Sequence, residues 1–255
     1  MLADLLATAC LILVPEGLSG LAYAEMSVVV LIGACLQGIG GIGFAMFSAP
    51  IAGLFFPQMA PGPLLVLGGA VSLLSALREH QAIDWPMAVV TLLGRFVGAA
   101  LAVAAIAVMS PKLLSIAFAL MILVAVGMIL AGWVLPPTRS NACGAGLVSG
   151  VMGTITSAGA PPFAILMQRM DPARFRATIG CILGAGAAVS LLMLASVGKF
   201  GLAQLHLGLA LLPWTLLGFA ASSTLGRHIS SRTVRATLLG MAAAGAAGIL
   251  IKAAL

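Results

Sequence analysis

Apolar stretches long enough to cross a membrane follow one another along almost the whole chain, and short polar turns separate them. A membrane-spanning helix needs about 20 apolar residues, because each residue adds about 1.5 Å to a helix that crosses about 30 Å of hydrocarbon. Hydrophobic residues make up 62% of the sequence and charged residues only 7%, whereas about a quarter of a soluble domain is charged. The sequence therefore predicts an all-α, multi-pass membrane protein with about eight spans.

Two related halves are predicted on either side of a short proline-rich linker at 136–140. Residues 26–135 form the first predicted transmembrane repeat and residues 141–255 the second. The expected spans are 26–37 continuing as 44–56, then 62–77, 86–108, 112–134, an interrupted span from 141 onward, 177–197, 203–225 and 234–253. Residues 1–25 are an apolar N-terminal extension: an interfacial helix, an extra span, or a stretch upstream of a true start at Met26.

Each predicted half contains a stretch in which glycine, proline and hydroxyl residues interrupt an apolar segment. The first reads GIGGIGFAMFSAP (38–50) and the second GVMGTITSAGAPP (150–162). An offset of 112 residues takes Gly38, Gly41 and Pro50 to Gly150, Gly153 and Pro162, and TLLG at 91–94 recurs at 215–218. Broken helix is tolerated in hydrocarbon only where it is buried in protein or lines a watery cavity. Matching breaks in two halves favour a transporter site where the repeats meet.

Arg95 is the cation that the sequence places well inside a span. It follows Gly94, some ten residues beyond the interfacial pair Asp84 and Trp85. An ionisable residue at membrane depth is a functional hypothesis by default, and the planar guanidinium suits an oxyanion. The alternative is an arginine that reaches for backbone carbonyls or the membrane surface. The predicted binding residues are Gly38, Gly40, Gly41, Gly43, Ser48, Pro50, Arg95, Gly150, Gly153, Thr154, Thr156, Ser157, Gly159, Pro161 and Pro162.

Several function classes fit this sequence poorly. All six acidic residues lie near predicted helix ends or loops, which argues against a carboxylate-based cation pump. The histidines lie near turns, the four cysteines lie in or beside apolar stretches, and neither set has metal-ligand spacing. We therefore predict no metal, no cofactor and no enzymatic activity. The net charge of +6 is scattered over loops, with no basic face for nucleic acid.

The loop charges give an expected orientation. With eight spans, one side holds Lys112, Arg169, Arg174, Arg176, Arg227, Arg232 and Arg235, and the other holds Arg78, Arg139, Lys199 and Lys252. Cytoplasmic loops carry the excess of Lys and Arg, so both ends of the eight-span unit are expected outside. This arrangement makes the repeats parallel. If the glycine-rich breaks are re-entrant, the repeats are inverted instead.

With these motifs in view, the chain resembles the sulfite exporter TauE/SafE family of membrane transporters. The likeness lies in GIGGIGFAMFSAP, in REHQAIDWP followed by LLGRFVGAALA, and in GLVSGVMGTITSAGAPPFAIL followed by DPARFRATIG. It implies an inner-membrane protein that moves small sulfur-containing anions such as sulfite or sulfonates. Family members carry a run of glycines in each half. Here residues 154–160 read TITSAGA, so hydroxyls replace part of the second run.

The resulting hypothesis is a transporter in which the two breaks meet near the membrane midplane. Backbone amides, the hydroxyls of the predicted set and Arg95 would hold the anion, and one half would rock against the other. Its expected partners are the small anion, the lipid bilayer and a coupling ion, H⁺ or Na⁺. Two other hypotheses remain: an anion channel, which predicts flux without saturation, and a non-transporting assembly factor that binds partner helices through small-residue faces.

Overall fold

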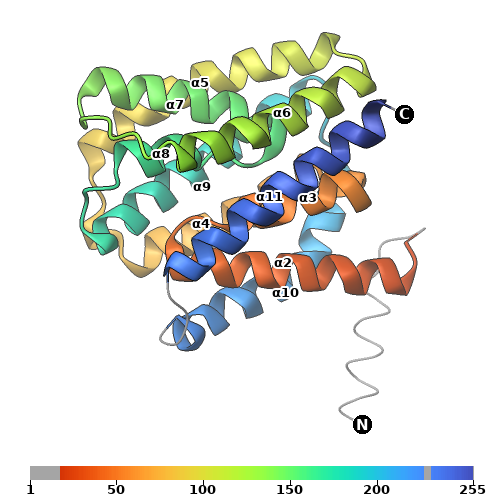
Figure 1. The fold of residues 1–255 in the computed structure, drawn as a ribbon, viewed down its shortest axis with the longest axis horizontal. Helices are drawn as coiled ribbons and strands as arrows, with labels where there is room; N and C mark the ends of the chain where they lie inside the picture. Colours follow the sequence, from red (N-terminus) through yellow and green to blue (C-terminus); the bar gives the residue numbers. More distant parts are fainter. Residues whose placement is uncertain (1–17, 227–230, 255) are drawn as a thin grey trace.

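The computed structural model describes residues 18–226 and 231–254 and is helical throughout them, with no strand in these ranges. The helices are α2 (Gly20–Gly40), α3 (Phe44–Phe55), α4 (Gly62–Arg78), α5 (Trp85–Val108), α6 (Pro111–Leu130), α7 (Arg139–Thr156), α8 (Pro161–Leu166), α9 (Pro172–Ser196), α10 (Leu202–Leu225) and α11 (Ser231–Ala254), with short 3-10 turns η1 (Pro57–Met59) and η2 (His80–Ala82) (Figure 1).

Six of these helices are long and apolar enough to cross a membrane: α2, α5, α6, α9, α10 and α11. The prediction of an all-α membrane protein is confirmed, and six candidate spans stand against the predicted number of about eight. The apolar helices α3 and α4 are shorter. Helix α2 begins at Gly20, six residues before the predicted start of the first repeat, while residues 1–17 of the predicted extension lie outside the described residues.

Polar caps set where the helices begin. The side chains of Ser19, Asp84, Ser110, Thr138 and Asp171 each accept a hydrogen bond from a backbone amide in the first turn of α2, α5, α6, α7 and α9. These bonds satisfy amides that have no partner inside the helix. Helices α5, α6 and α9 also carry proline in the first turn, where its missing donor costs nothing. Capping side chains and prolines therefore fix the starts of these helices.

The chain reverses at the first break instead of continuing through it. Helix α3 folds back along α2, because Ser48 and Phe44 of α3 fill the space beside Gly33 in the middle of α2. The Ser48 hydroxyl also donates to the Val29 carbonyl at 3.5 Å. The expectation that the span 26–37 continues across the membrane as 44–56 is therefore wrong, and the reversal agrees with the alternative of a re-entrant break. Glycine at 33 allows the close approach that makes the reversal possible.

Two pairs of helices pack side by side in parallel through glycine. Helix α5 lies on α7, with Gly94 against the Cys143 carbonyl and Gly98 against the Leu147 carbonyl. Helix α2 lies on α10, with Gly218 against the Leu31 carbonyl. A β-carbon at any of these glycines would overlap the partner's backbone. Small residues therefore allow close helix packing here, and Gly150 of α7 does the same where it packs on α5.

The remaining helices join these two pairs. Helix α4 runs antiparallel to α9, since Gly180 meets the Ser72 carbonyl while Gly69 meets Ala187. Helix α11 packs on α3 and α6, and α8 packs on α6 and α7. The start of α2 and the C-terminus lie at the same end of the bundle, on the right in Figure 1.

Because the chain reverses at each break, the basic residues are distributed between the two ends of the bundle differently from the prediction. The α4–α5, α6–α7 and α8–α9 connections share one end, which carries the described arginines Arg78, Arg139, Arg169, Arg174 and Arg176. We call it the arginine end. Ion pairs join Arg174 to Asp84 at 2.8 Å and Arg176 to Glu79 at 2.5 Å there. The opposite end, which we call the lysine end, carries Lys112, Lys199 and Lys252.

Candidate functional site

Arg95 lies in the middle of α5 on the face that packs against α7 and α9. Only 2% of its surface is exposed. Helix α5 buries a stripe of small residues on this face, among them Ala88, Gly94 and Gly98. Small side chains let the neighbouring backbones come close, so the long arginine side chain is enclosed by protein. The structure thus places Arg95 inside the bundle, with its guanidinium away from both ends.

Three glycines from different segments form a slot for the Arg95 side chain. A β-carbon added at Gly153 would lie 2.9 Å from Nη2, and one at Gly159 would lie 2.7 Å from Nη1. A β-carbon at Gly186 of α9 would overlap Nε itself. Gly153 and Gly186 have ordinary helical backbones, so backbone conformation does not require glycine at either position. Their lack of a side chain makes room for the guanidinium.

The hydrogen bonds of Arg95 leave its charge without a counter-ion. Nη1 donates to the Ser149 hydroxyl, and the Ser149 carbonyl lies 3.4 Å from the same nitrogen. The Ser149 hydroxyl in turn donates to the Gly159 carbonyl at 2.6 Å. Nε has no hydrogen-bond partner, and no ion pair joins Arg95 to a carboxylate in the described part of the chain. A buried, unpaired cation costs several kcal/mol, so this position favours an anion.

The first break reverses the chain with two glycines and one glutamine. Gly41 ends α2 with φ of 76°, and Gly43 precedes α3 with φ of 153°; both values favour glycine. The Gln37 side chain accepts from the Phe44 amide at 3.1 Å and donates to the Ser72 hydroxyl at 2.8 Å. The next two amides, those of Ala45 and Met46, lie in the first turn of α3 and therefore have no acceptor within the helix. They carry the partial positive charge of a helix N-terminus.

The second break uses hydroxyls where the first uses glycine. Ser157 ends α7 with φ of 63°, a left-handed conformation that is uncommon outside glycine. Its hydroxyl donates to the Pro61 carbonyl at 3.0 Å. The Thr156 hydroxyl donates to the Met152 carbonyl at 2.7 Å and accepts from the Ala158 amide at 3.1 Å. Internal hydrogen bonds therefore stabilise this reversal.

The two breaks face each other across a small central cavity of about 30 Å³. Gly43 to Met46 contribute one wall, and Ser157 to Ala160 contribute another together with Arg95. The remaining lining residues are Gln37, Leu64, Leu65, Gly68, Gly69, Ser72, Leu183 and Ala187. This volume holds about one water molecule. The cavity therefore has the chemistry of an anion site, and it must widen to admit a polyatomic ion.

The structure brings only part of the predicted set to this cavity. Gly43, Arg95, Ser157 and Gly159 line it, Gly150 and Gly153 pack against Arg95, and Pro161 and Pro162 begin the buried helix α8. Gly38 and Gly40 lie in the last turn of α2, and Gly41 packs against Arg176. Ser48 and Pro50 lie further along α3, against α2 and α11.

Six residues predicted as parts of broken backbone are helical: Gly38, Gly40, Gly150, Gly153, Thr154 and Thr156. The reason is that each helix runs up to its break, so the breaks themselves are only 41–43 and 157–160. Thr154 shares a hydrogen bond of 2.8 Å with Ser190 on α9. Its hydroxyl, like that of Thr156, is therefore engaged inside the protein.

Sequence reasoning missed Gln37, Ser149 and Gly186. The offset of 112 residues that relates the breaks also takes Gln37 to Ser149, and each of these side chains fastens its own break by a hydrogen bond. That signal was present in the sequence. Gly186 had none, because its importance comes from Arg95, which lies 91 positions earlier in the chain.

The fold and the cavity together define a multi-pass helical membrane protein with a buried, unpaired cation where two reversed segments meet. The family model described as Sulfite exporter TauE/SafE matches residues 26–249, and the chain belongs to this family. The resemblance seen in the sequence is thereby confirmed. No curated protein and no solved structure matches the chain. The family is one of membrane transporters for sulfite-type anions.

Proposed function

We propose that this protein transports a small sulfur-containing oxyanion, of the sulfite or sulfonate kind, by exposing the central cavity to each face of the inner membrane in turn. The observation that carries the proposal is Arg95, which is buried, has an unpaired Nε and has no carboxylate partner within residues 18–226 and 231–254. An oxyanion supplies the charge and the acceptors that this group lacks. Binding of the anion compensates a charge that the protein itself leaves uncompensated.

The binding groups come from both breaks. Arg95 of α5 lies beside the second break in the cavity wall, where Ser149 bonds it from behind, while the free amides of Ala45 and Met46 belong to the first break. An anion between them would gain a charged donor on one wall and a helix N-terminus on the other. Because the cavity is about 30 Å³, the walls separate when the anion enters. This coupling of binding to separation is what alternating access requires.

We further infer that the two halves are inverted repeats. Helices α2 to α6 correspond in order to α7 to α11, and the contacts respect this correspondence: α2 packs on α10 as α7 packs on α5, and α3 packs on α11 as α8 packs on α6. The residues related by the sequence repeats also make matching contacts: Leu31 faces Gly218 as Cys143 faces Gly94, with Cys143 112 positions after Leu31 and Gly218 124 positions after Gly94. In this arrangement α2 and α7 run in opposite directions, which supports inverted repeats over parallel ones.

Flux of radiolabelled sulfite into proteoliposomes tests the proposal. We expect saturable uptake above that of empty liposomes, inhibited by sulfonates and accelerated when sulfite is present on the opposite side of the membrane. Imposed H⁺ and Na⁺ gradients, applied separately, identify the coupling ion. Absence of flux from protein shown to be folded would contradict this substrate assignment. Flux without saturation or acceleration from the opposite side would contradict alternating access.

A further inference from the structure

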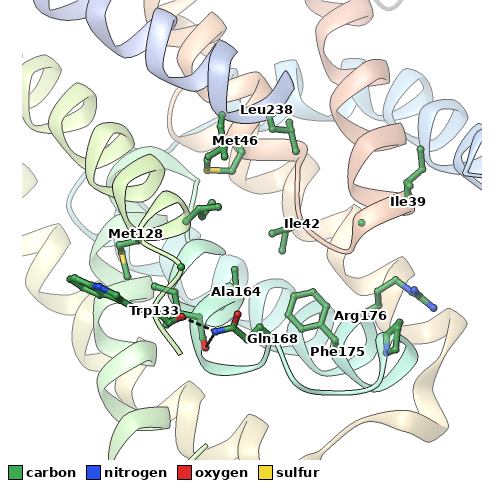
Figure 2. Close-up of a pocket in the computed structure, with 16 residues that line it drawn as sticks. Ile39, Ile42, Met46, Met128, Trp133, Ala164, Gln168, Phe175, Arg176 and Leu238 are labelled. Carbon is green, nitrogen blue, oxygen red and sulfur yellow. Dashed lines mark hydrogen bonds between the residues drawn. The ribbon is translucent and has the colours of Figure 1, made fainter. Parts of the chain in front are cut away.

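A second cavity, of about 310 Å³, adjoins the central one (Figure 2). We call it the vestibule. It lies between the end of α2, the start of α3, the end of α6, α8, the first turns of α9 and the third turn of α11. Its walls are mainly apolar, with Ile42, Met128, Phe175 and Leu238 among the lining residues. The vestibule is thus about ten times as large as the central cavity.

The polar groups of the vestibule are already engaged. Gln168 donates to the Trp133 carbonyl at 2.7 Å and to the Ile165 carbonyl at 3.1 Å. Arg176 is paired with Glu79. An anion in the vestibule therefore meets no unpaired cation, in contrast to the central cavity. A wide space that offers an anion little binding energy is suited to passage, because conduction needs sites that release the ion as readily as they admit it.

The vestibule lies at the arginine end of the bundle. Trp133 lies on its rim with 64% of its surface exposed, and Pro172 and Arg176 belong to the α9 start, which follows the arginine-rich α8–α9 connection. Lys112, Lys199 and Lys252 lie at the other end. Because cytoplasmic connections hold the excess of basic residues, the arginine end faces the cytoplasm. The vestibule therefore opens toward the cytoplasm.

Met46 is the residue that lines both cavities, and only 3% of its surface is exposed. Around it the two cavities use neighbouring residues of the same segments: Ile42 and Ala164 in the vestibule, Gly43 and Ala160 in the central cavity. At the lysine end the central cavity is closed, where Ser157 donates to Pro61 and Leu64 is fully buried. Among the described residues, Met46 is thus the one that the two linings share.

We propose that the vestibule is the cytoplasmic entrance to the anion site and that the Met46 side chain is the barrier between them. This inference rests on the proposed function for the identity of the passing anion. The barrier is apolar, so it also keeps water away from Arg95 while the site is empty. Methionine suits this role because its unbranched side chain can swing aside at little cost.

Thiol labelling tests the entrance. In the full-length chain, with Cys10, Cys35, Cys143 and Cys181 replaced by serine, single cysteines are introduced as Ile42→Cys in the vestibule, Arg139→Cys at the arginine end and Lys112→Cys at the lysine end. A membrane-impermeant maleimide is applied to inverted and to right-side-out vesicles. We expect Ile42→Cys and Arg139→Cys to react in inverted vesicles and Lys112→Cys in right-side-out ones. Reaction of Ile42→Cys only from the Lys112 side would overturn the proposal.

The barrier has its own test, in which Ala160→Cys reports access to the central cavity. We expect this cysteine to react about tenfold faster from the cytoplasmic side when Met46→Ala is added, because an apolar constriction has been removed. The matched control is Met59→Ala, since Met59 is also fully buried but lines neither cavity. Equal rates in the Met46→Ala and Met59→Ala backgrounds would show that Met46 is not the barrier.

These outcomes are separate from those of the flux assay. Labelling measures access by the maleimide and needs no transported substrate. If sulfite is not transported but Met46→Ala still opens the central cavity, the entrance is correct and the substrate assignment is wrong. If sulfite is transported while Ile42→Cys stays unreactive in vesicles where Arg139→Cys reacts, the anion enters by another path and the entrance is wrong.

Discussion

The two breaks solve the same backbone problem by different means. At the first, Gly41 and Gly43 adopt conformations that favour glycine, and the neutral side chain of Gln37 fastens the turn. At the second, Ser157 adopts a left-handed conformation without being glycine, and Ser149 fastens the turn while it also bonds Arg95. The first break therefore supplies backbone amides, and the second holds the charged group that Arg95 of α5 supplies. We infer that the anion's affinity depends chiefly on the second break and the reversal of the chain chiefly on the first.

Replacing the charged group should give the largest effect. Arg95→Lys keeps the charge but loses the planar fork, and hydrogen bonds to a charged group are worth about 1.5–3 kcal/mol each, so we expect transport to fall by about 10- to 100-fold. Sulfite flux in proteoliposomes measures this. Arg139→Lys, on an exposed arginine at the start of α7, should leave the flux unchanged. If Arg95→Lys leaves the affinity for sulfite and the transport rate unaltered, the anion's affinity does not depend on the guanidinium held at the second break.

Filling the slot should produce the next largest effect. Gly186→Ala places a methyl group on Nε of Arg95, and overpacking of this kind costs about 1–3 kcal/mol of stability. Displacement of the guanidinium should also weaken sulfite binding. Thermal unfolding in detergent, followed by tryptophan fluorescence, reports the stability.

A matched control and a double mutant sharpen this prediction. Gly144→Ala in α7 adds a methyl group with no atom within 4 Å, so it should cost little. In an Arg95→Ala background the slot is empty, and Gly186→Ala should then lose its destabilising effect. If the cost of Gly186→Ala is the same with and without the arginine side chain, Gly186 does not act through Arg95.

Replacing Gln37 and Ser149, the side chains that fasten the two breaks, should lower protein stability in both cases but change the affinity for the anion only at Ser149. Gln37→Leu leaves the Phe44 amide and the Ser72 hydroxyl without their partner, at a cost of about 1–3 kcal/mol in stability. Ser149→Ala should cost a similar amount and in addition raise the KM for sulfite, because Arg95 loses its hydroxyl partner. Unfolding and flux are measured on both variants. An equal rise in KM for Gln37→Leu would argue against the division of labour between the breaks.

Substitutions at the left-handed turn residues should have the smallest effect on stability, and the effect should differ between the two breaks. Gly41→Ala forces a β-carbon into a left-handed conformation and to 2.8 Å from Cγ of Arg176, so it should destabilise by about 1–2 kcal/mol. Ser157→Gly relieves a comparable strain but loses the hydrogen bond to Pro61, so its net effect should be within about 0.5 kcal/mol of zero. Unfolding midpoints of the two variants decide whether this asymmetry is real.

The sequence predicted the features that depend on local chemistry. Apolar stretches located most of the helices, the glycine and proline clusters located both breaks, and the position of Arg95 within an apolar span singled it out. The direction of the chain after each break could not be predicted, because it depends on contacts such as that between Gly33 and Ser48. That direction also decides which loop charges share an end of the molecule.

The predicted site was too broad for a related reason. Glycine has two uses here, flexible backbone at Gly41 and close packing at Gly150, and composition does not distinguish them. A hydroxyl near a break can likewise be used for a hydrogen bond within the protein, as that of Thr154 is with Ser190. Only the three-dimensional neighbours reveal which use applies.

The glycine contacts between α5 and α7 limit how the molecule can move. Each glycine of α5 sits against a carbonyl of α7 with no side chain between them, so neither helix can slide or tilt without the other. Yet α5 belongs to the predicted first half and α7 to the predicted second, and α2 and α10 are joined in the same way. These close contacts therefore tie helices of different predicted halves together: α5 to α7 in the upper part of Figure 1, and α2 to α10 in the lower part. We infer that neither predicted half can move as a unit on its own, because such a motion would break backbone contacts that no side chain cushions.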